Sequence, residues 1–250
     1  MKNDLTRYML REHFKSSVLV SAVIAGFMSL FFIILALVIG ETDDKSVNNF
    51  ITIILLVWGG FVSSIGAGIN GINMSIYMNR SRKTAVKSIF TTILLICAVT
   101  AAIAVAAEGL AAGVAHTQGF GYAFKPLLYA GRETDTQIGF LTVICAYAFD
   151  VLALFAVSVA SLFIVAASMA FGKWVWIGWW IFYMLLLMTG KSVIRAVGGF
   201  AKDIFGSTSG AVLGALLAAA VVFTVLDVLF IRRVQLKKSA LMWTQNARRA

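Results

Sequence analysis

Three acids stand inside long apolar runs of this sequence, and they are the side chains with the clearest potential for chemistry: Glu108, Asp150 and Asp227. A carboxyl among hydrocarbon is costly, so such a residue is first considered as part of a polar route or as a proton carrier. Asp150 stands twelve residues into the run 138–171. At about 1.5 Å per residue this places it roughly 18 Å below one end, near the middle of a membrane.

The three acids also have structural interpretations. Glu108, near the end of its run, and Asp150 can each be a carboxyl, neutral or charged, that is hydrogen-bonded between helices. Neither has a His or Lys at a spacing typical of a proton relay, and both interpretations are open. Asp227 lies about a turn before Arg232 and Arg233, where pairing or water would satisfy it, and we interpret it as structural.

One glycine-rich stretch matches a nucleotide-binding pattern. Gly66, Gly68 and Gly71 give G-x-G-x-x-G within the sequence GAGING. The dinucleotide fingerprint also needs a preceding strand and an acidic residue about twenty positions later, and an apolar run supplies neither. The sequence instead predicts close helix packing, because small residues recur here at about four-residue spacing. The small residues concerned are Ser64, Ala67, Gly68 and Gly71.

A second stretch ends like a phosphate-binding loop. Gly190, Lys191 and Ser192 read G-K-S, but Leu185 stands where G-x-x-x-x-G-K-S requires its first glycine. We therefore expect neither an ATP site nor a catalytic site in this chain. If the protein uses ATP, a partner subunit must bind it.

Metal and disulfide chemistry have little support. His13 and His116 are far apart and have no Cys or acidic neighbour at ligand spacing, so no metal site is expected. Cys97 and Cys145 lie within apolar runs at different predicted depths. We expect two small packing residues and no disulfide between them.

The composition of the chain predicts the class of protein in which these residues lie. Hydrophobic residues make up 60% of the 250 residues and charged residues 13%, and the mean hydropathy is +0.92. One soluble core cannot bury that much apolar surface, so the chain is predicted to be an integral membrane protein. The net charge of +10 sits in short segments beside the apolar runs, which indicates membrane topology and not nucleic-acid binding.

Apolar runs predict an all-α fold with six transmembrane helices. The runs are residues 17–40, 50–77, 88–112, 138–171, 174–188 and 209–231. The fifth run has about 15 residues against the ~20 that a bilayer requires, and an interrupted amphipathic segment follows it, so a re-entrant element is predicted before the sixth helix. Residues 1–16 are predicted to form an interfacial helix, and residues 232–250 form a basic tail.

The distribution of positive charge assigns the two sides of the membrane. Six spans place both termini on one side, and fifteen of the 21 Lys and Arg residues fall there: in the N-terminal segment, the second-to-third connection, Lys173 and the tail. The remaining six are balanced by six acids in the opposite connections. By the positive-inside rule both termini are cytoplasmic, in a multi-pass protein of the cell membrane.

The connection between the second and third spans, residues 78–87, is a basic island. One interpretation is that its charges do no more than set the orientation of the chain in the membrane. However, the layout of six spans, a charged N-terminal segment, this connection and a re-entrant segment resembles the ABC-2 type permease family. In that family the connection carries a Gly-hydrophobic-Ser-Arg-Lys pattern. Here Ser81, Arg82 and Lys83 match the pattern, whereas Asn79 and Arg80 replace its first pair.

The resemblance implies a single transmembrane permease domain over residues 1–250, in a type V-like ABC exporter. Two copies of the chain would form the translocation route as a homodimer, with Glu108 and Asp150 as candidates for lining it. Separate ATP-binding subunits would supply ATP and Mg²⁺. A short coupling helix would dock on them through Met78, Asn79, Arg80, Ser81, Arg82 and Lys83. The N-terminal segment would be an elbow helix, and the re-entrant segment an extracellular gate.

The expected partners also include membrane lipid, whose phosphates could pair with the basic island, and exclude nucleic acid. Compact permeases of this family are similar to exporters of antimicrobial or amphipathic peptides, and weakly charged helices rich in Ala, Gly and aromatic residues favour such a cargo. Two alternatives are an ATP-independent secondary transporter or membrane enzyme, which predicts clustered polar residues in the spans, and a sensor or immunity component without net transport.

Overall fold

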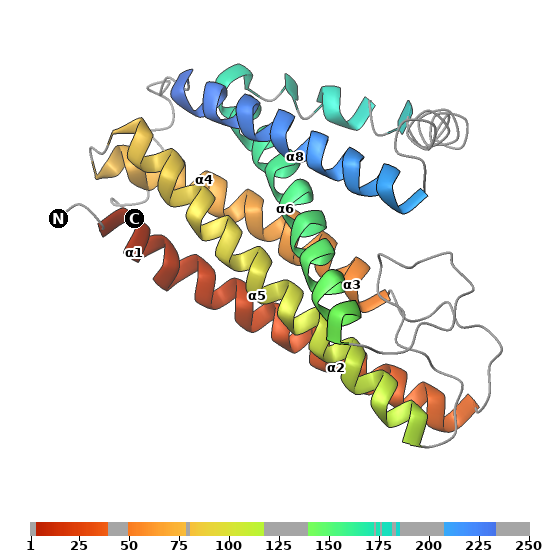
Figure 1. Ribbon diagram of the computed structural model, residues 1–250. Coiled ribbons are helices and arrows are strands. Elements are labelled where there is room, and N and C mark those ends of the chain that lie inside the picture. The colour runs from red at the N-terminus through yellow and green to blue at the C-terminus, as the bar shows by residue number, and fades with distance from the viewer. Residues whose placement is uncertain are drawn as a thin grey trace.

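Every regular element in the described part of the chain is a helix (Figure 1). The computed structural model describes residues 4–39, 50–78, 81–117, 140–172, 174–175, 177–181, 184–185 and 208–233. The predicted all-α class is confirmed for these residues.

The N-terminal segment runs into the first span without a turn. α1 (Asp4–Met9) leads into a π-helical segment, η1 (Leu10–Phe14), which leads into α2 (Lys15–Ile39). Met9 (φ −58°, ψ −42°) and Lys15 (φ −59°, ψ −48°) at the two junctions both have α-helical angles. The helix expected for residues 1–16 is therefore continuous with the span that it was expected to precede.

The second span is also interrupted by a π-helical segment. α3 (Phe50–Leu55), η3 (Leu56–Val62) and α4 (Ser63–Tyr77) follow one another directly. A π-helix bonds each N–H to the carbonyl five residues earlier, so the regular α-helical ladder is broken there. Inside a membrane, the backbone groups left over must find partners on neighbouring helices.

Two helices are longer than a bilayer requires. α5 (Arg82–Thr117) has 36 residues and α6 (Phe140–Phe171) has 32. They correspond to about 54 and 48 Å, against ~30 Å of hydrocarbon. α5 begins six residues before the apolar run predicted at 88–112, because the basic residues at its start continue the helix. α8 (Thr208–Arg233) corresponds to the sixth predicted span.

α5 is the central helix of the described chain, because it contacts α1, η1, α2, α3, η3, α4, α6 and α8. α6 contacts α4, α5, η3 and α8. α2 and α5 pack along each other, and in Figure 1 the red and yellow helices run side by side while the green α6 crosses them. α1 packs against α4 and α5, so the N-terminal segment lies at the end of the molecule where α4 gives way to α5.

Five helical stretches in the described residues are long and apolar enough to cross a membrane. They are Leu5–Phe31, Ile51–Tyr77, Arg82–Leu110, Val143–Phe171 and Val212–Arg232. The described chain thus has the helices of a multi-pass membrane protein. The predicted fifth span, 174–188, is described only in short helical pieces, and the predicted re-entrant segment lies outside the described residues. The six-span topology stays a prediction.

The small-residue stripe of α4 packs as the sequence predicts. Its members are all buried: Ser64, Ala67, Gly68 and Gly71. A Cβ placed on Gly68 would lie 2.6 Å from Leu162 Cδ1 of α6, and one placed on Gly71 would lie 2.5 Å from Ile89 Cγ1 of α5. Glycine therefore lets α4 approach both helices closely, which confirms the packing interpretation of the GAGING stretch.

Candidate functional site

The described part of the basic island belongs to the ends of two long helices. Met78 follows α4 and donates its backbone N–H to the carbonyl of Met74 at 2.8 Å. Arg82 and Lys83 form the first turn of α5. Asn79 and Arg80 lie outside the described residues. Of the six residues that the family resemblance assigns to a coupling helix, Met78 thus follows α4, and Arg82 and Lys83 belong to α5. Their coupling role stays a prediction.

Ser81 caps the start of α5. Its Oγ accepts a hydrogen bond from the backbone N–H of Thr84 at 3.3 Å and also lies 2.9 Å from the Thr84 hydroxyl. Ser81 is thus the N-cap residue and Thr84 the third residue of the helix, which is the geometry that satisfies one of the unpaired N–H groups of a first turn. The serine of the Ser-Arg-Lys match has a local structural role.

Arg82 joins the start of α5 to the end of α8. Its Nη1 donates hydrogen bonds to the backbone carbonyls of Ile231 at 3.3 Å and Arg232 at 3.2 Å. Carbonyls of a last helical turn have no partner within the helix and carry partial negative charge, which a guanidinium complements. Two helix ends that are far apart in the sequence are therefore held together at the basic island.

The N-terminal segment packs against the same place. Leu5 and Met9 are buried in one hydrophobic cluster with Ala85 and Ile89 of α5. The same cluster includes Ile231 of α8, and Met78 packs against it. The Thr6 hydroxyl lies 2.7 Å from that of Ser88, another residue of α5. We call this meeting point of α1, α4, α5 and α8 the basic hub.

Charged side chains of the basic hub point outward. Lys83 and Lys87 are exposed, as is Arg82. Arg11 and Glu12 approach to 4.0 Å with 79% and 55% of their side chains exposed, so this ion pair is worth little in stability. The basic hub therefore combines exposed positive side chains with a buried apolar cluster beneath them.

A second polar region lies in the interior, around η3. The carbonyl of Gly60 accepts a hydrogen bond from the Ser158 hydroxyl of α6 at 3.1 Å, with the Ser161 hydroxyl at 3.5 Å. A Cβ on Gly60 would lie 3.4 Å from the Leu154 carbonyl oxygen. The Gly60 carbonyl of the π-helical segment is thus contacted by two serines on one face of α6, a side-chain bond between helices of the kind that the membrane interior favours.

Glu108 caps the first helix of the second span. Its Oε1 accepts hydrogen bonds from the backbone N–H of Thr52, at 3.2 Å, and from the Thr52 hydroxyl. Thr52 stands in the first turn of α3, where N–H groups have no partner within the helix and the helix dipole favours negative charge. Both residues are buried. Glu108 of α5 therefore serves as a cap for α3, the hydrogen-bonded alternative that the sequence left open.

Asp150 is different, because part of its carboxyl has no partner. It is 1% exposed, and no described group bonds its Oδ1. Asp150 lies on α6, which packs against α5, the helix that carries Glu108. The two acids proposed to line a route thus belong to two packed helices, and one of them is hydrogen-bonded to Thr52 while the other has an oxygen without a described partner.

Asp227, which the sequence interpretation takes as structural with pairing or water to satisfy it, has no hydrogen bond to Arg232. It is fully buried, and within the described residues neither carboxyl oxygen has a hydrogen-bond partner. Arg232 is exposed. Phe223 and Phe230, on the same helix, pack on Phe163 of α6 at centroid distances of 5.6 and 5.5 Å. Asp227 thus lies in the helix that carries this aromatic contact.

The cysteines and the potential metal ligands form no further site among the described residues. Both cysteines are free; Cys97 is buried with its Sγ 3.4 Å from the Ser158 hydroxyl, and Cys145 is exposed. Within the residues that the structure describes, no three His, Cys, Asp or Glu side chains converge as metal ligands would. The buried acids of α5 and α6 are therefore the chemical focus of the described interior.

Sequence reasoning did not single out Thr52, Gly60, Ser158 or Ser161. Two signals could have pointed to them. The Gly-Gly pair ending at Gly60 interrupts an apolar run, and Ser158 and Ser161, three residues apart, fall on one helix face. Nothing in the sequence links Thr52 to Glu108, because their contact joins residues 56 positions apart.

The chain was compared with family models, with curated proteins and with solved structures, and none of them matches it. The resemblance to the ABC-2 type permeases therefore remains a hypothesis that rests on the span layout and on Ser81, Arg82 and Lys83.

Proposed function

We propose that this chain is the transmembrane permease subunit of an ATP-driven exporter, moved by a separate ATP-binding subunit that docks on the basic hub. The observation that carries the proposal is the double hydrogen bond of Arg82 to the end of α8. A partner that displaces the first turn of α5 would act on α8 through this bond and on α1 and α4 through the buried cluster.

The same helix connects the hub to the interior acids. Arg82 and Glu108 are 26 residues apart on one unbroken α-helix, which corresponds to about 39 Å. A rigid helix of that length transmits a tilt at one end as a displacement at the other. Movement at the hub would reach Glu108 and its cap on Thr52, and α6, which carries Asp150, packs against the same helix.

The proposed assembly contains two copies of the chain and two ATP-binding subunits, which bring ATP and Mg²⁺. The cargo class that fits best is an amphipathic peptide, because the spans are apolar with only scattered carboxyls. Glu108 and Asp150 are proposed to border the route.

Charge reversal at the island tests this function. Arg80, Arg82 and Lys83 are changed together to Glu, and the tagged chain is purified from its native membrane. We expect the protein to remain in the membrane while the co-purifying ATPase falls to background. A matched control changes Lys191, Arg195 and Lys202 to Glu, three basic residues that the charge distribution assigns to the opposite side of the membrane, and should keep the ATPase bound. Full association and transport in the island variant would refute the docking role.

A second candidate function is an ion-coupled secondary transporter, and one observation favours it: the buried oxygen of Asp150 that has no partner among the described residues. The two functions separate in one experiment. Export from energised vesicles that stops on dissipation of the ion gradient, and continues without nucleotide, selects the secondary transporter. Export that needs ATP and co-purifies with an ATPase selects the permease.

A further inference from the structure

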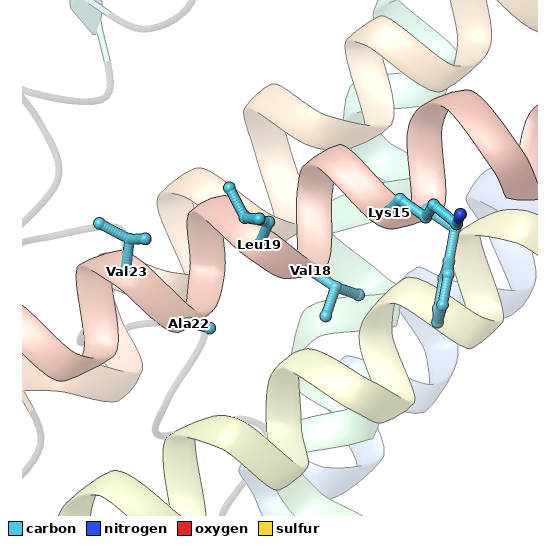
Figure 2. Close-up of a pocket in the computed structure, with 6 residues that line it drawn as sticks. Lys15, Val18, Leu19, Ala22 and Val23 are labelled. Carbon is cyan, nitrogen blue, oxygen red and sulfur yellow. The ribbon is translucent and has the colours of Figure 1, made fainter.

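An apolar groove runs along the first span and ends at a lysine (Figure 2). Its lining residues lie on one helical stretch: Phe14, Lys15, Val18, Leu19, Ala22 and Val23. Leu19 and Val23 are 66% and 63% exposed. Phe14 and Val18 are half-buried, whereas Lys15 and Ala22 are exposed.

The shape of the groove follows from helical spacing. Figure 2 shows Lys15 at one end of the row and Val23 at the other, with Val18 and Ala22 on the side of α2 that faces the pale yellow α5. Ala22 contributes only a methyl group between larger side chains, which hollows the surface. Lys15 and Val23 are eight residues apart, or about 12 Å along the helix. One leaflet of hydrocarbon is ~15 Å deep, so the groove has the length of a lipid acyl chain in one leaflet.

The positive charge of Lys15 at the end of the groove indicates an occupant with an anionic group. No carboxyl in the described residues lies within ion-pair distance of Lys15, and the adjacent Glu12 pairs with Arg11. A lysine at the edge of an apolar surface extends its ammonium toward the headgroup region while its methylene stem covers hydrocarbon. Phospholipid phosphates lie in that region, and anionic lipids are concentrated in the cytoplasmic leaflet, where the charge distribution places this end of the chain.

We propose that this groove binds an anionic phospholipid, with an acyl chain along Val18, Leu19 and Ala22 and the phosphate at Lys15. A helix of a second copy or of another protein is a different occupant, and it would have to place an acid opposite Lys15. Phospholipid needs no such matched residue, because its headgroup supplies the charge and the bilayer supplies the chain. The proposal does not depend on the transport function.

Native mass spectrometry of the full-length protein in detergent, titrated with phosphatidylglycerol or phosphatidylcholine, tests the proposal. We expect phosphatidylglycerol to bind the wild type more tightly than phosphatidylcholine does. Lys15→Gln should weaken phosphatidylglycerol binding about fivefold, the equivalent of the ~1 kcal/mol that one basic residue contributes near an anionic surface. Lys87→Gln, at an exposed lysine of the same end but outside the groove, should leave binding unchanged.

A steric pair tests the acyl-chain half of the proposal. Ala22→Trp fills the groove and should weaken phosphatidylglycerol binding, whereas Ala218→Trp, at an exposed alanine of α8, should not. Thermal unfolding of each variant verifies that it is folded, and the Lys15→Gln comparison stands if Ala22→Trp is not. Equal losses in Lys15→Gln and Lys87→Gln would reduce the effect to general surface attraction and overturn the site. A change in oligomeric mass in Ala22→Trp, with lipid binding retained, would assign the groove to a protein partner instead.

Discussion

Arg82 donates a hydrogen bond from its guanidinium to the backbone carbonyl of Ile231, 149 positions along the chain. The basic island is thereby part of the tertiary structure and not only a charged connection. The bond joins the start of the longest described helix to the end of the last one.

Arg82→Ala should lower the free energy of unfolding modestly. The side chain is exposed and its bonds to two carbonyls compete with water, so we expect a loss of about 0.5–1 kcal/mol. Lys83→Ala, at the next residue and also exposed, should change stability by less than about 0.5 kcal/mol. Denaturant titration in mixed micelles measures both. Equal effects at the two positions would contradict a specific contact of Arg82 with α8.

Removing the Glu108 carboxyl should weaken the start of α3. Glu108→Ala leaves the buried N–H and hydroxyl of Thr52 without their acceptor, and we expect it to cost about 1–3 kcal/mol. Thr52→Val, which removes the hydroxyl donor and keeps the volume, should be coupled to it. A double-mutant cycle should give a coupling energy of about 0.5–1.5 kcal/mol. Additive effects of the two substitutions would show that the contact contributes nothing.

Asp150→Asn should change transport more than stability. The buried Oδ1 has no described partner to lose, so the free energy of unfolding should stay within about 1 kcal/mol. If Asp150 borders the route, export in reconstituted vesicles should fall at least about tenfold, equivalent to ~1.4 kcal/mol in the barrier. Asp227→Asn is the matched control, a buried acid on α8, and should keep export. Loss of protein abundance with normal export per molecule would make Asp150 a packing residue.

Glycines of α4 should differ sharply in their tolerance of a methyl group. At Gly71 a Cβ would lie 2.5 Å from Ile89 Cγ1, an atom close to the backbone, so Gly71→Ala should destabilise by about 1–3 kcal/mol. At Gly66 a Cβ would meet nothing within 4 Å, and Gly66→Ala should stabilise by about 0.5–1 kcal/mol through helix propensity. Thermal unfolding of the two variants measures the difference. The same sign of change at both positions would contradict the packing arrangement.

Hydropathy predicted the membrane helices well where apolar length alone decides. Hydropathy predicted the third span at residues 88–112, but α5 begins earlier, at Arg82. The helix extends beyond the apolar run because Ser81 caps its start and Arg82 bonds a carbonyl at the end of α8. The spacing of small residues also predicted the close packing of α4, because residues about four positions apart lie on one face of a helix and meet the same neighbouring helices.

The interior site was harder to anticipate. Sequence position predicts a depth for Asp150 but not which helix packs against it, because that depends on how α5 and α6 cross. Asp227 stands about a turn before Arg232, but the sequence does not show that the first is buried and the second exposed. The Gly60 carbonyl of the π-helical segment accepts a hydrogen bond from Ser158 of α6, a contact between distant residues that local propensity does not predict.

The π-helical segment η3 also sets the rotational phase between the two halves of the second span. One residue corresponds to about 100° around an α-helix, so the wider turns in this segment determine which way α4 faces once the position of α3 is set by Thr52 and Glu108. Conversion of η3 to a regular α-helix would turn Gly68 and Gly71 away from Leu162 and Ile89 and bring side chains of other sizes against those helices. The second span therefore has a built-in angular offset, and the close contact of α4 with α5 and α6 exists only while that offset is kept.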